Sequence, residues 1–209
     1  METFAPAIFA PEFCGMEVHP RIRFDDTAVA FSYKSDRALR KANLIFTLVN
    51  HPWMSAVATY AVKLAFQLRL PVKGLVRITA FEHFCGGETI DQSEKTIQQL
   101  ARFQVGTILD YSVEGENSEA DFDHTCSEIL KTFDKAKGNP AIPFCVFKVT
   151  GLGDMALLEK VQAREPLSPE EQTAMFRVRQ RVKQICEKAY QTEVPVPVDA
   201  EDSWIQDTI

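Results

Sequence analysis

The chain has 209 residues, and its 23 Lys and Arg residues against 29 Asp and Glu residues give a formal net charge of −6. A hydrophobic share of 45% and a charged share of 25% are ordinary for globular proteins and exclude a wholly disordered chain. The acidic balance argues against nucleic-acid binding, which usually needs a basic face. Since domains average about 150 residues, this length predicts one domain with an appendage.

Targeting signals and metal-binding spacings are not evident in the sequence. The most apolar stretch, residues 54–70, is interrupted by Lys63, Gln67 and Arg69, and is therefore a poor candidate for a membrane span. Residues 1–15 have no basic leader, so we expect no signal peptide. The five cysteines are odd in number and widely spaced, which predicts reduced thiols in a cytosolic protein. We expect no metal site, because no zinc-ligand set is complete.

Residues 1–104 are expected to form a helical arm. Its first 35 residues show no sustained period, and we expect an irregular segment with one short strand at 28–33. Ser35 is suited to cap a helix, and Pro52 to open the next one. The helix that follows Pro52 is apolar on most sides, which is typical of a helix buried between neighbours. The helices expected in the arm span about residues 35–48, 52–68, 72–83 and 89–103.

Residues 105–209 alternate between β-branched apolar runs and amphipathic segments. Strands are expected at 105–111, 143–149 and 194–198, and helices at 119–137, 154–164 and 169–190. The last helix has a strong start in the sequence Ser168-Pro-Glu-Glu. Strands that alternate with helices predict an α/β fold with a parallel sheet.

Polar residues stand where the expected strands end: Asp110 and Glu114, Lys148, and Asp199 with Glu201. In parallel α/β folds the carboxyl ends of strands carry the chemistry. Lys148 has the ordinary interpretation of an edge lysine with its head in water. Within an apolar strand, however, its charge needs an anionic partner or ligand, such as a substrate carboxylate. Asp199 has its own ordinary interpretation as a helix cap.

A second candidate site is the sequence Gly151-Leu-Gly153-Asp-Met-Ala156, which fits the dinucleotide fingerprint G-x-G-x-x-G/A. The wider context of that fingerprint is missing. Another strand–helix unit precedes it, and the acids about 20 residues on, Glu170 and Glu171, open a helix instead of ending a strand. A tight turn is the simpler interpretation of these glycines.

Four motifs, in order, carry a family resemblance: FCGGETI at 84–90, GTILDYSVE at 106–114, FKVTGLG at 147–153 and VDAEDSWIQ at 198–206. The chain resembles proline dehydrogenase from about residue 35 to its C-terminus, and most of all the single-function bacterial type and its mitochondrial relatives. The resemblance implies a distorted (βα)8, TIM-like barrel, of which residues 105–209 would form the first three strands. It also implies FAD as cofactor, oxidation of L-proline to 1-pyrroline-5-carboxylate, and a quinone as electron acceptor.

Site roles follow from the same resemblance. Lys148 would bind the substrate carboxylate, and Glu114 would pair with an arginine that closes over the substrate. Asp199 would belong to the catalytic polar network, and Ala200 would touch the flavin through its backbone. Asp110 matches an acid at a strand end whose role the resemblance does not specify.

The family's substrate-binding arginine pair and several flavin and substrate contacts have no counterpart in this sequence. A complete barrel has eight strands, so we expect a fragment that is inactive without the missing C-terminal half of the barrel. The expected location is cytoplasmic, with at most peripheral contact with the inner membrane. The alternatives are a hydroxyproline dehydrogenase of the same family, a small non-catalytic nucleotide-binding α/β protein that uses Gly151 and Gly153, and a helical interaction module on residues 35–104.

Overall fold

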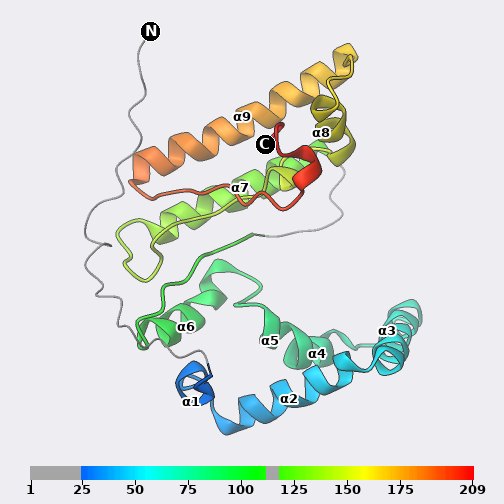
Figure 1. Ribbon diagram of the computed structural model, residues 1–209, viewed down its shortest axis with the longest axis vertical. Helices are drawn as coiled ribbons and strands as arrows, with labels where there is room; N and C mark the ends of the chain where they lie inside the picture. Colours follow the sequence, from blue (N-terminus) through cyan, green and yellow to red (C-terminus); the bar gives the residue numbers. More distant parts are fainter. Residues whose placement is uncertain (1–24, 112–117) are drawn as a thin grey trace.

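Helices dominate the protein in its computed structural model, which describes residues 25–111 and 118–209 (Figure 1). Two groups of helices are visible: α1 to α6 in one, and α7 to α9 in the other (Figure 1). The first group contains α1 (Thr27–Ala30), α2 (Asp36–Asn50), α3 (Pro52–Gln67), α4 (Lys73–Val76), the π-helix η2 (Arg77–Phe81), α5 (Glu82–Phe84) and α6 (Ile90–Ala101). The second contains α7 (Glu119–Ala136), α8 (Met155–Gln162) and α9 (Pro169–Thr192).

Local capping explains where these helices begin. The Ser35 hydroxyl accepts a hydrogen bond from the Ala38 amide at the start of α2, and Thr89 caps α6 in the same way. Pro52 occupies the first turn of α3, where its missing N–H costs nothing. Ser168 and Glu171 form a complete capping box at the start of α9. The helices predicted from the sequence are confirmed within a few residues.

The expected βα units are not formed, and the prediction of a partial barrel is wrong. In the described residues, the runs 105–111, 143–149 and 194–198 contain no strand, and the only pairing is an isolated parallel bridge between Phe147 and Val198. Single backbone hydrogen bonds join the neighbouring segments, such as Thr107 N to Ala141 O at 2.8 Å and Cys145 N to Pro195 O at 3.1 Å.

Proline explains much of this difference. The run 194–198 reads Val-Pro-Val-Pro-Val, and the run 143–149 begins with Pro143. Proline has no N–H to donate, so the hydrogen-bond ladder of a parallel sheet cannot continue through these positions. The apolar pattern therefore places extended chain in the core, but it does not build strands there.

The short strand expected at 28–33 is also wrong. Asp26 accepts hydrogen bonds from the Ala28 and Val29 amides and caps the single-turn helix α1 in its place. A local side-chain cap thus overrides the weak β-propensity of this run.

The core lies in the second group of helices, where α7 and α9 run side by side (Figure 1). Phe133 of α7 and Ile185 of α9 are fully buried, together with Cys145 and Phe147 from the extended segment between α7 and α8. The buried Arg181 of α9 is held by α7, through Glu119 and through Asp123 at 2.8 Å. This packing fixes the extended segments that carry the candidate site.

Candidate functional site

Lys148 is surrounded by three carboxylates from two other segments of the chain. Its Nζ atom lies 2.8 Å from Glu201 Oε1, 3.8 Å from Asp110 Oδ2 and 3.8 Å from Asp199 Oδ2. The Lys148 side chain is 20% exposed, so its ammonium group is partly withdrawn from water. We call Lys148, Asp110, Asp199 and Glu201 the lysine cluster.

The isolated bridge positions this cluster. The Asp199 amide donates to the Phe147 carbonyl at 3.0 Å, which sets Asp199 beside Lys148 where the two extended segments run in parallel. Asp110 comes from the neighbouring segment, which the Thr107–Ala141 hydrogen bond holds at its other end. Residues that stand 38 to 53 positions from Lys148 in the chain are thereby brought beside it.

Neighbouring charges and burial both shift the pKa values of Lys148 and Asp110. The hydrogen bond that Lys148 donates to Glu201 raises the pKa of Lys148 above its ordinary value, against the effect of burial, and the carboxylates of Asp110 and Asp199 raise it further. Burial raises the pKa of Asp110; Lys148 offsets part of this rise, and Asp199 and Glu201 add to it. Three carboxylates against one ammonium leave the cluster with an excess of negative charge.

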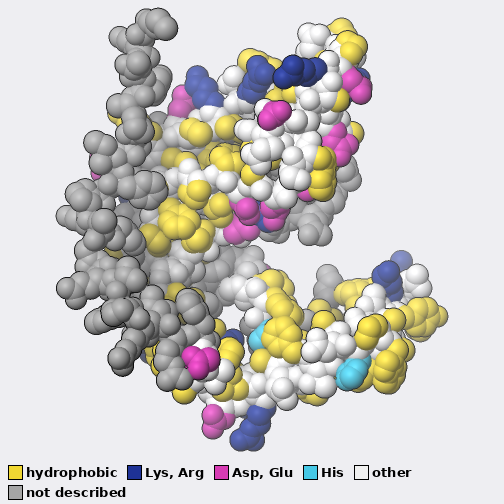
Figure 2. Space-filling view, viewed as in Figure 1, with side chains coloured by type: hydrophobic (Ala, Val, Ile, Leu, Met, Phe, Trp, Pro, Cys, Tyr) yellow, Lys and Arg dark blue, Asp and Glu magenta, His cyan; other side chains and the backbone are white. Residues whose placement is uncertain are grey.

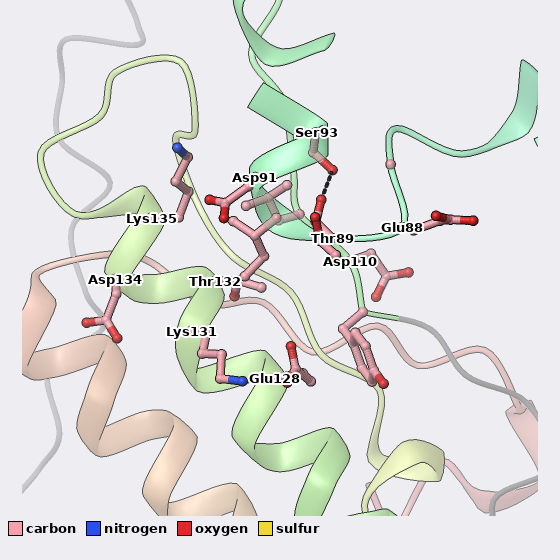
Figure 3. Close-up of a pocket in the computed structure, with 14 residues that line it drawn as sticks. Glu88, Thr89, Asp91, Ser93, Asp110, Glu128, Lys131, Thr132, Asp134 and Lys135 are labelled. Carbon is pink, nitrogen blue, oxygen red and sulfur yellow. Dashed lines mark hydrogen bonds and ion pairs between the residues drawn. The ribbon is translucent and has the colours of Figure 1, made fainter. Parts of the chain in front are cut away.

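A pocket of about 570 Å³ opens beside the cluster, with Asp110 at its edge (Figure 3). Side chains from the start of α6, among them Thr89 and Asp91, face residues from the second half of α7 across it (Figure 3). Its lining also includes Leu109 and Tyr111. The pocket is large enough for a small organic molecule, and Asp110 connects it to the lysine cluster.

The lysines that line this pocket are already paired. Lys131 Nζ lies 2.6 Å from Glu128, and Lys135 forms an ion pair with Glu94 of α6. The remaining charged lining residues are acids: Glu88, Asp91, Asp110 and Asp134. Three of these acids are paired as well: Glu88 with Arg77, Asp110 with Lys148 and Asp134 with Lys188.

The structure brings together four of the five polar residues that the sequence placed at the ends of apolar runs: Asp110, Lys148, Asp199 and Glu201. Ala200 follows them and is exposed, and Glu114 lies outside the described residues. Glu201 is the residue nearest to Lys148 in this cluster, and sequence reasoning gave it no role. Glu201 stands two residues after Asp199, which could have marked it as a candidate. No local sequence pattern, however, predicts which acid forms an ion pair with a given lysine.

Gly151 and Gly153 serve packing in this structure. A Cβ atom on Gly153 would lie 2.4 Å from Val178 Cγ2 of α9, so the glycine permits close approach of the two segments. The Asp154 carboxylate caps α8 and accepts from the Leu157 amide at 3.0 Å. An acid at this helix start would repel a phosphate, and the dinucleotide interpretation is not favoured.

Within residues 25–111 and 118–209, no group of three or more His, Cys, Asp or Glu side chains is arranged to hold a metal ion. In the same residues, no helix has both the length and the apolar character needed to cross a membrane.

Comparisons with known proteins match the part of the chain that carries the cluster. The family model for proline dehydrogenase matches residues 93–209. The carbapenem antibiotics biosynthesis protein CarD of Pectobacterium carotovorum subsp. carotovorum is 32% identical over 126 residues, which cover 60% of this chain and 34% of that protein.

Two mitochondrial proteins are similar as well. Proline dehydrogenase 1 of Dictyostelium discoideum is 36% identical over 95 residues, covering 45% of this chain and 17% of that protein. Proline dehydrogenase 1 of Arabidopsis thaliana is 25% identical over 176 residues, covering 66% of this chain and 35% of that protein. The chain thus spans about a third or less of the length of these curated relatives. Because the family model covers more than half of it, the chain belongs to the proline dehydrogenase family.

Proposed function

We propose that the chain contributes the substrate carboxylate site of an FAD-dependent enzyme that oxidises L-proline to 1-pyrroline-5-carboxylate and passes the electrons to a quinone. The observation that carries this proposal is the lysine cluster, in which Lys148 is held among Asp110, Asp199 and Glu201. Family membership supports the same reaction. We retain a cytoplasmic location as part of the proposal.

Free proline is a zwitterion, and the cluster offers a partner to each of its charges. Lys148 Nζ can donate to the substrate carboxylate, because an ammonium group has three donors and Glu201 occupies one of them. Glu201 has a 49% exposed side chain and can turn towards water when the substrate binds. Asp110 and Asp199, each 3.8 Å from Nζ, lie within reach of the secondary ammonium group of a proline bound there.

The reaction removes a hydride from the ring carbon next to nitrogen that does not carry the carboxylate, and a proton from the nitrogen. A C=N double bond is left between these two atoms. Asp199 is the carboxylate that we propose orients the nitrogen and its proton. Burial raises the pKa of Asp110, which favours its protonated form.

FAD would supply the acceptor for the two electrons when bound. Val198 is 43% exposed and Ala200 is exposed, so this segment beside the cluster leaves room for a flat ring to approach. This supports the role that the resemblance gives to Ala200.

Replacement of Lys148 tests the proposal in an enzyme preparation that contains this chain and reduces a quinone analogue with L-proline. We expect Lys148→Ala to raise the KM for L-proline strongly, because the substrate carboxylate loses its charged partner. L-prolinamide lacks that carboxylate, so its KM should change little. Lys183→Ala is the matched control, since Lys183 is an exposed lysine of α9 paired only within its helix. An unchanged KM for L-proline in Lys148→Ala would refute the role.

A further inference from the structure

Glu201 differs from the other two acids of the lysine cluster in the way it contacts Lys148. It is the nearest of the three, with Oε1 at 2.8 Å from Nζ, and its side chain is also the most exposed, at 49% against 45% for Asp199 and 35% for Asp110. Among the described residues, its carboxylate forms a hydrogen bond or ion pair with Lys148 alone. Glu201 therefore belongs to the cluster through a single contact that is open to water.

The backbone is held on both sides of Glu201, and its side chain is the part that can move. The Asp199 amide donates to the Phe147 carbonyl at 3.0 Å, which fixes the chain two residues before Glu201. The short 3-10 helix η4 (Ser203–Ile205) follows, and its last residue is fully buried. Rotation about the side-chain bonds of Glu201 can thus exchange its contact in the cluster for water while the segment stays in place.

Loss of the Glu201 contact does not leave the ammonium group of Lys148 without a partner. Asp110 and Asp199 remain 3.8 Å from Nζ. A charge withdrawn from water is strongly destabilised when its last partner is removed, but this one keeps two. The contact is thus replaceable. An external carboxylate approaches Lys148 from the solvent, where Glu201 is the most exposed of the three acids, and the two carboxylates compete for the same ammonium group.

The charge of the cluster decides which external carboxylates can replace Glu201. Three carboxylates and one ammonium group give the cluster a formal charge of −2. A simple carboxylate that binds Lys148 lies against these acids, whereas an amino acid brings an ammonium group that pairs with them. Figure 2 shows further Asp and Glu side chains gathered at the edge of the second group of helices that faces the first group, and their field also repels anions. Repulsion of a wrong ligand is one physical basis of specificity.

We propose that Glu201 occupies Lys148 in place of the substrate carboxylate while the site is empty, and that its negative charge makes the site select the zwitterion of an amino acid over a simple carboxylate. Glu201 acts through Lys148, and is thus a positioning residue that affects specificity. The inference rests on the proposed function, because it takes Lys148 to be the partner of the substrate carboxylate.

Binding to the full chain, measured by calorimetry without a quinone, tests this exchange. The probes are L-proline and cyclopentanecarboxylate, which has a five-membered ring and a carboxylate but no nitrogen. We expect Glu201→Gln to lower the Kd of cyclopentanecarboxylate by about fivefold, the upper limit for an exposed ion pair. The Kd of L-proline should fall by less, because its ammonium group loses an acid that attracts it. The ratio of the two Kd values should therefore fall, whereas a merely structural role would weaken both ligands alike.

Further variants separate the charge of Glu201 from its position. Glu201→Asp keeps the charge, and its Kd ratio should stay near that of the wild type. Glu187→Gln removes an equal charge from an exposed acid of α9 that pairs with Lys183, and it should leave the ratio unchanged. Cyclopentanecarboxylate should bind no more tightly to the double variant Lys148→Ala, Glu201→Gln than to Lys148→Ala, because Glu201 acts through Lys148. Circular dichroism of each variant confirms that its helices remain.

Three results would overturn the inference: an unchanged Kd ratio in Glu201→Gln, an equal fall of the ratio in Glu187→Gln, and an absence of cyclopentanecarboxylate binding to Glu201→Gln. The inference and the proposed function fail separately. If the KM for L-proline depends on Lys148 while the Kd ratio does not depend on Glu201, the inference is refuted and the proposed function stands. If the ratio falls in Glu201→Gln but L-proline is not oxidised, the proposed function is refuted and the exchange at Lys148 is supported.

Discussion

Lys148 Nζ and Glu201 Oε1 lie 2.8 Å apart, although 53 positions separate the two residues in the chain. Their hydrogen bond is the strongest influence that raises the pKa of Lys148. The pair connects the extended segment before α8 with the segment after α9. It also holds the ammonium group that we propose binds the substrate carboxylate.

Glu201→Gln should lower the pKa of Lys148, because the ammonium form loses its nearest carboxylate. The titration of Lys148 can be followed by NMR after methylation of the lysines with a ¹³C label, with Lys148→Arg used to assign its signal. Glu187→Gln, at an exposed acid paired with Lys183, should leave the Lys148 titration in place. An unchanged titration in Glu201→Gln would show that the pair does not persist in solution.

The pair of Lys148 and Glu201 stabilises the folded state by an amount that depends on pH. The pKa of Lys148 is raised above its ordinary value of 10.5, so the stabilisation is fully present below that value. It is lost as the pH rises through the raised pKa. The free energies of unfolding of the wild type and Glu201→Gln should therefore converge only in strongly alkaline solution.

Glu119→Gln should destabilise the fold at neutral pH by about 1–3 kcal/mol, because the buried Arg181 loses a charged partner. Arg177 and Arg181 hold the pKa of Glu119 below its ordinary value of 4.5, against the effect of burial. The contribution is therefore present above that value and is lost as the pH falls through the lowered pKa. Urea unfolding at neutral and acidic pH measures both effects.

The control for this pair is Asp134→Asn, which removes the partner of Lys188 at a 63% exposed acid. Exposed pairs contribute at most about 1 kcal/mol, so this variant should remain close to the wild type. If the difference between the wild type and Glu119→Gln did not shrink in acid, a contribution other than charge would be responsible.

Gly153→Ala should destabilise the protein by about 1–3 kcal/mol, since its new methyl group would overlap with Val178. Val178 is buried and β-branched, and it has little freedom to move aside. Thermal unfolding should show partial recovery in the double variant Gly153→Ala, Val178→Ala. Gly151→Ala, whose Cβ would lie 3.3 Å from Thr125 Cγ2, should cost less. Equal losses at both glycines would contradict the packing role of Gly153.

Phe133→Ala should cost about 3–5 kcal/mol, because it leaves a cavity at the centre of the core between α7 and α9. Phe176→Ala changes the same residue type at a 60% exposed position of α9, and its effect should stay within about 0.5 kcal/mol. Chemical denaturation compares the two. Similar losses would mean that the core is centred elsewhere.

Sequence predicted the helix starts well, because capping is local. Ser35, Thr89 and Ser168 each accept a hydrogen bond from an amide three positions on, so the residues that decide the boundary lie within one helical turn. The sequence places Asp110, Lys148 and Asp199 at the ends of apolar runs, and the structure brings them together without the expected sheet. The roles assigned to Lys148, Asp199, Ala200 and Glu114 remain predictions.

The apolar runs themselves did not determine strands. Hydrophobic patterning indicates which segments are buried. A parallel sheet also needs an uninterrupted series of backbone N–H donors in its adjacent strands, and Pro143, Pro195 and Pro197 interrupt that series. The first three units of the barrel were inferred from pattern and resemblance, and the backbone hydrogen bonds contradict them.

By itself, the sequence thus determined the helices, their caps and the apolar runs of the second half that enter the core. It wrongly predicted that the helix after Pro52 is buried between neighbours, since no residue of α3 is buried. The tertiary structure decided which distant charges meet: Lys148 with Glu201, and Arg181 with Glu119. Such pairs depend on how α7, α9 and the extended segments pack. A charged group that is withdrawn from water needs a partner, and it pairs with the group that packing brings within hydrogen-bond distance. No local pattern of residues encodes that choice.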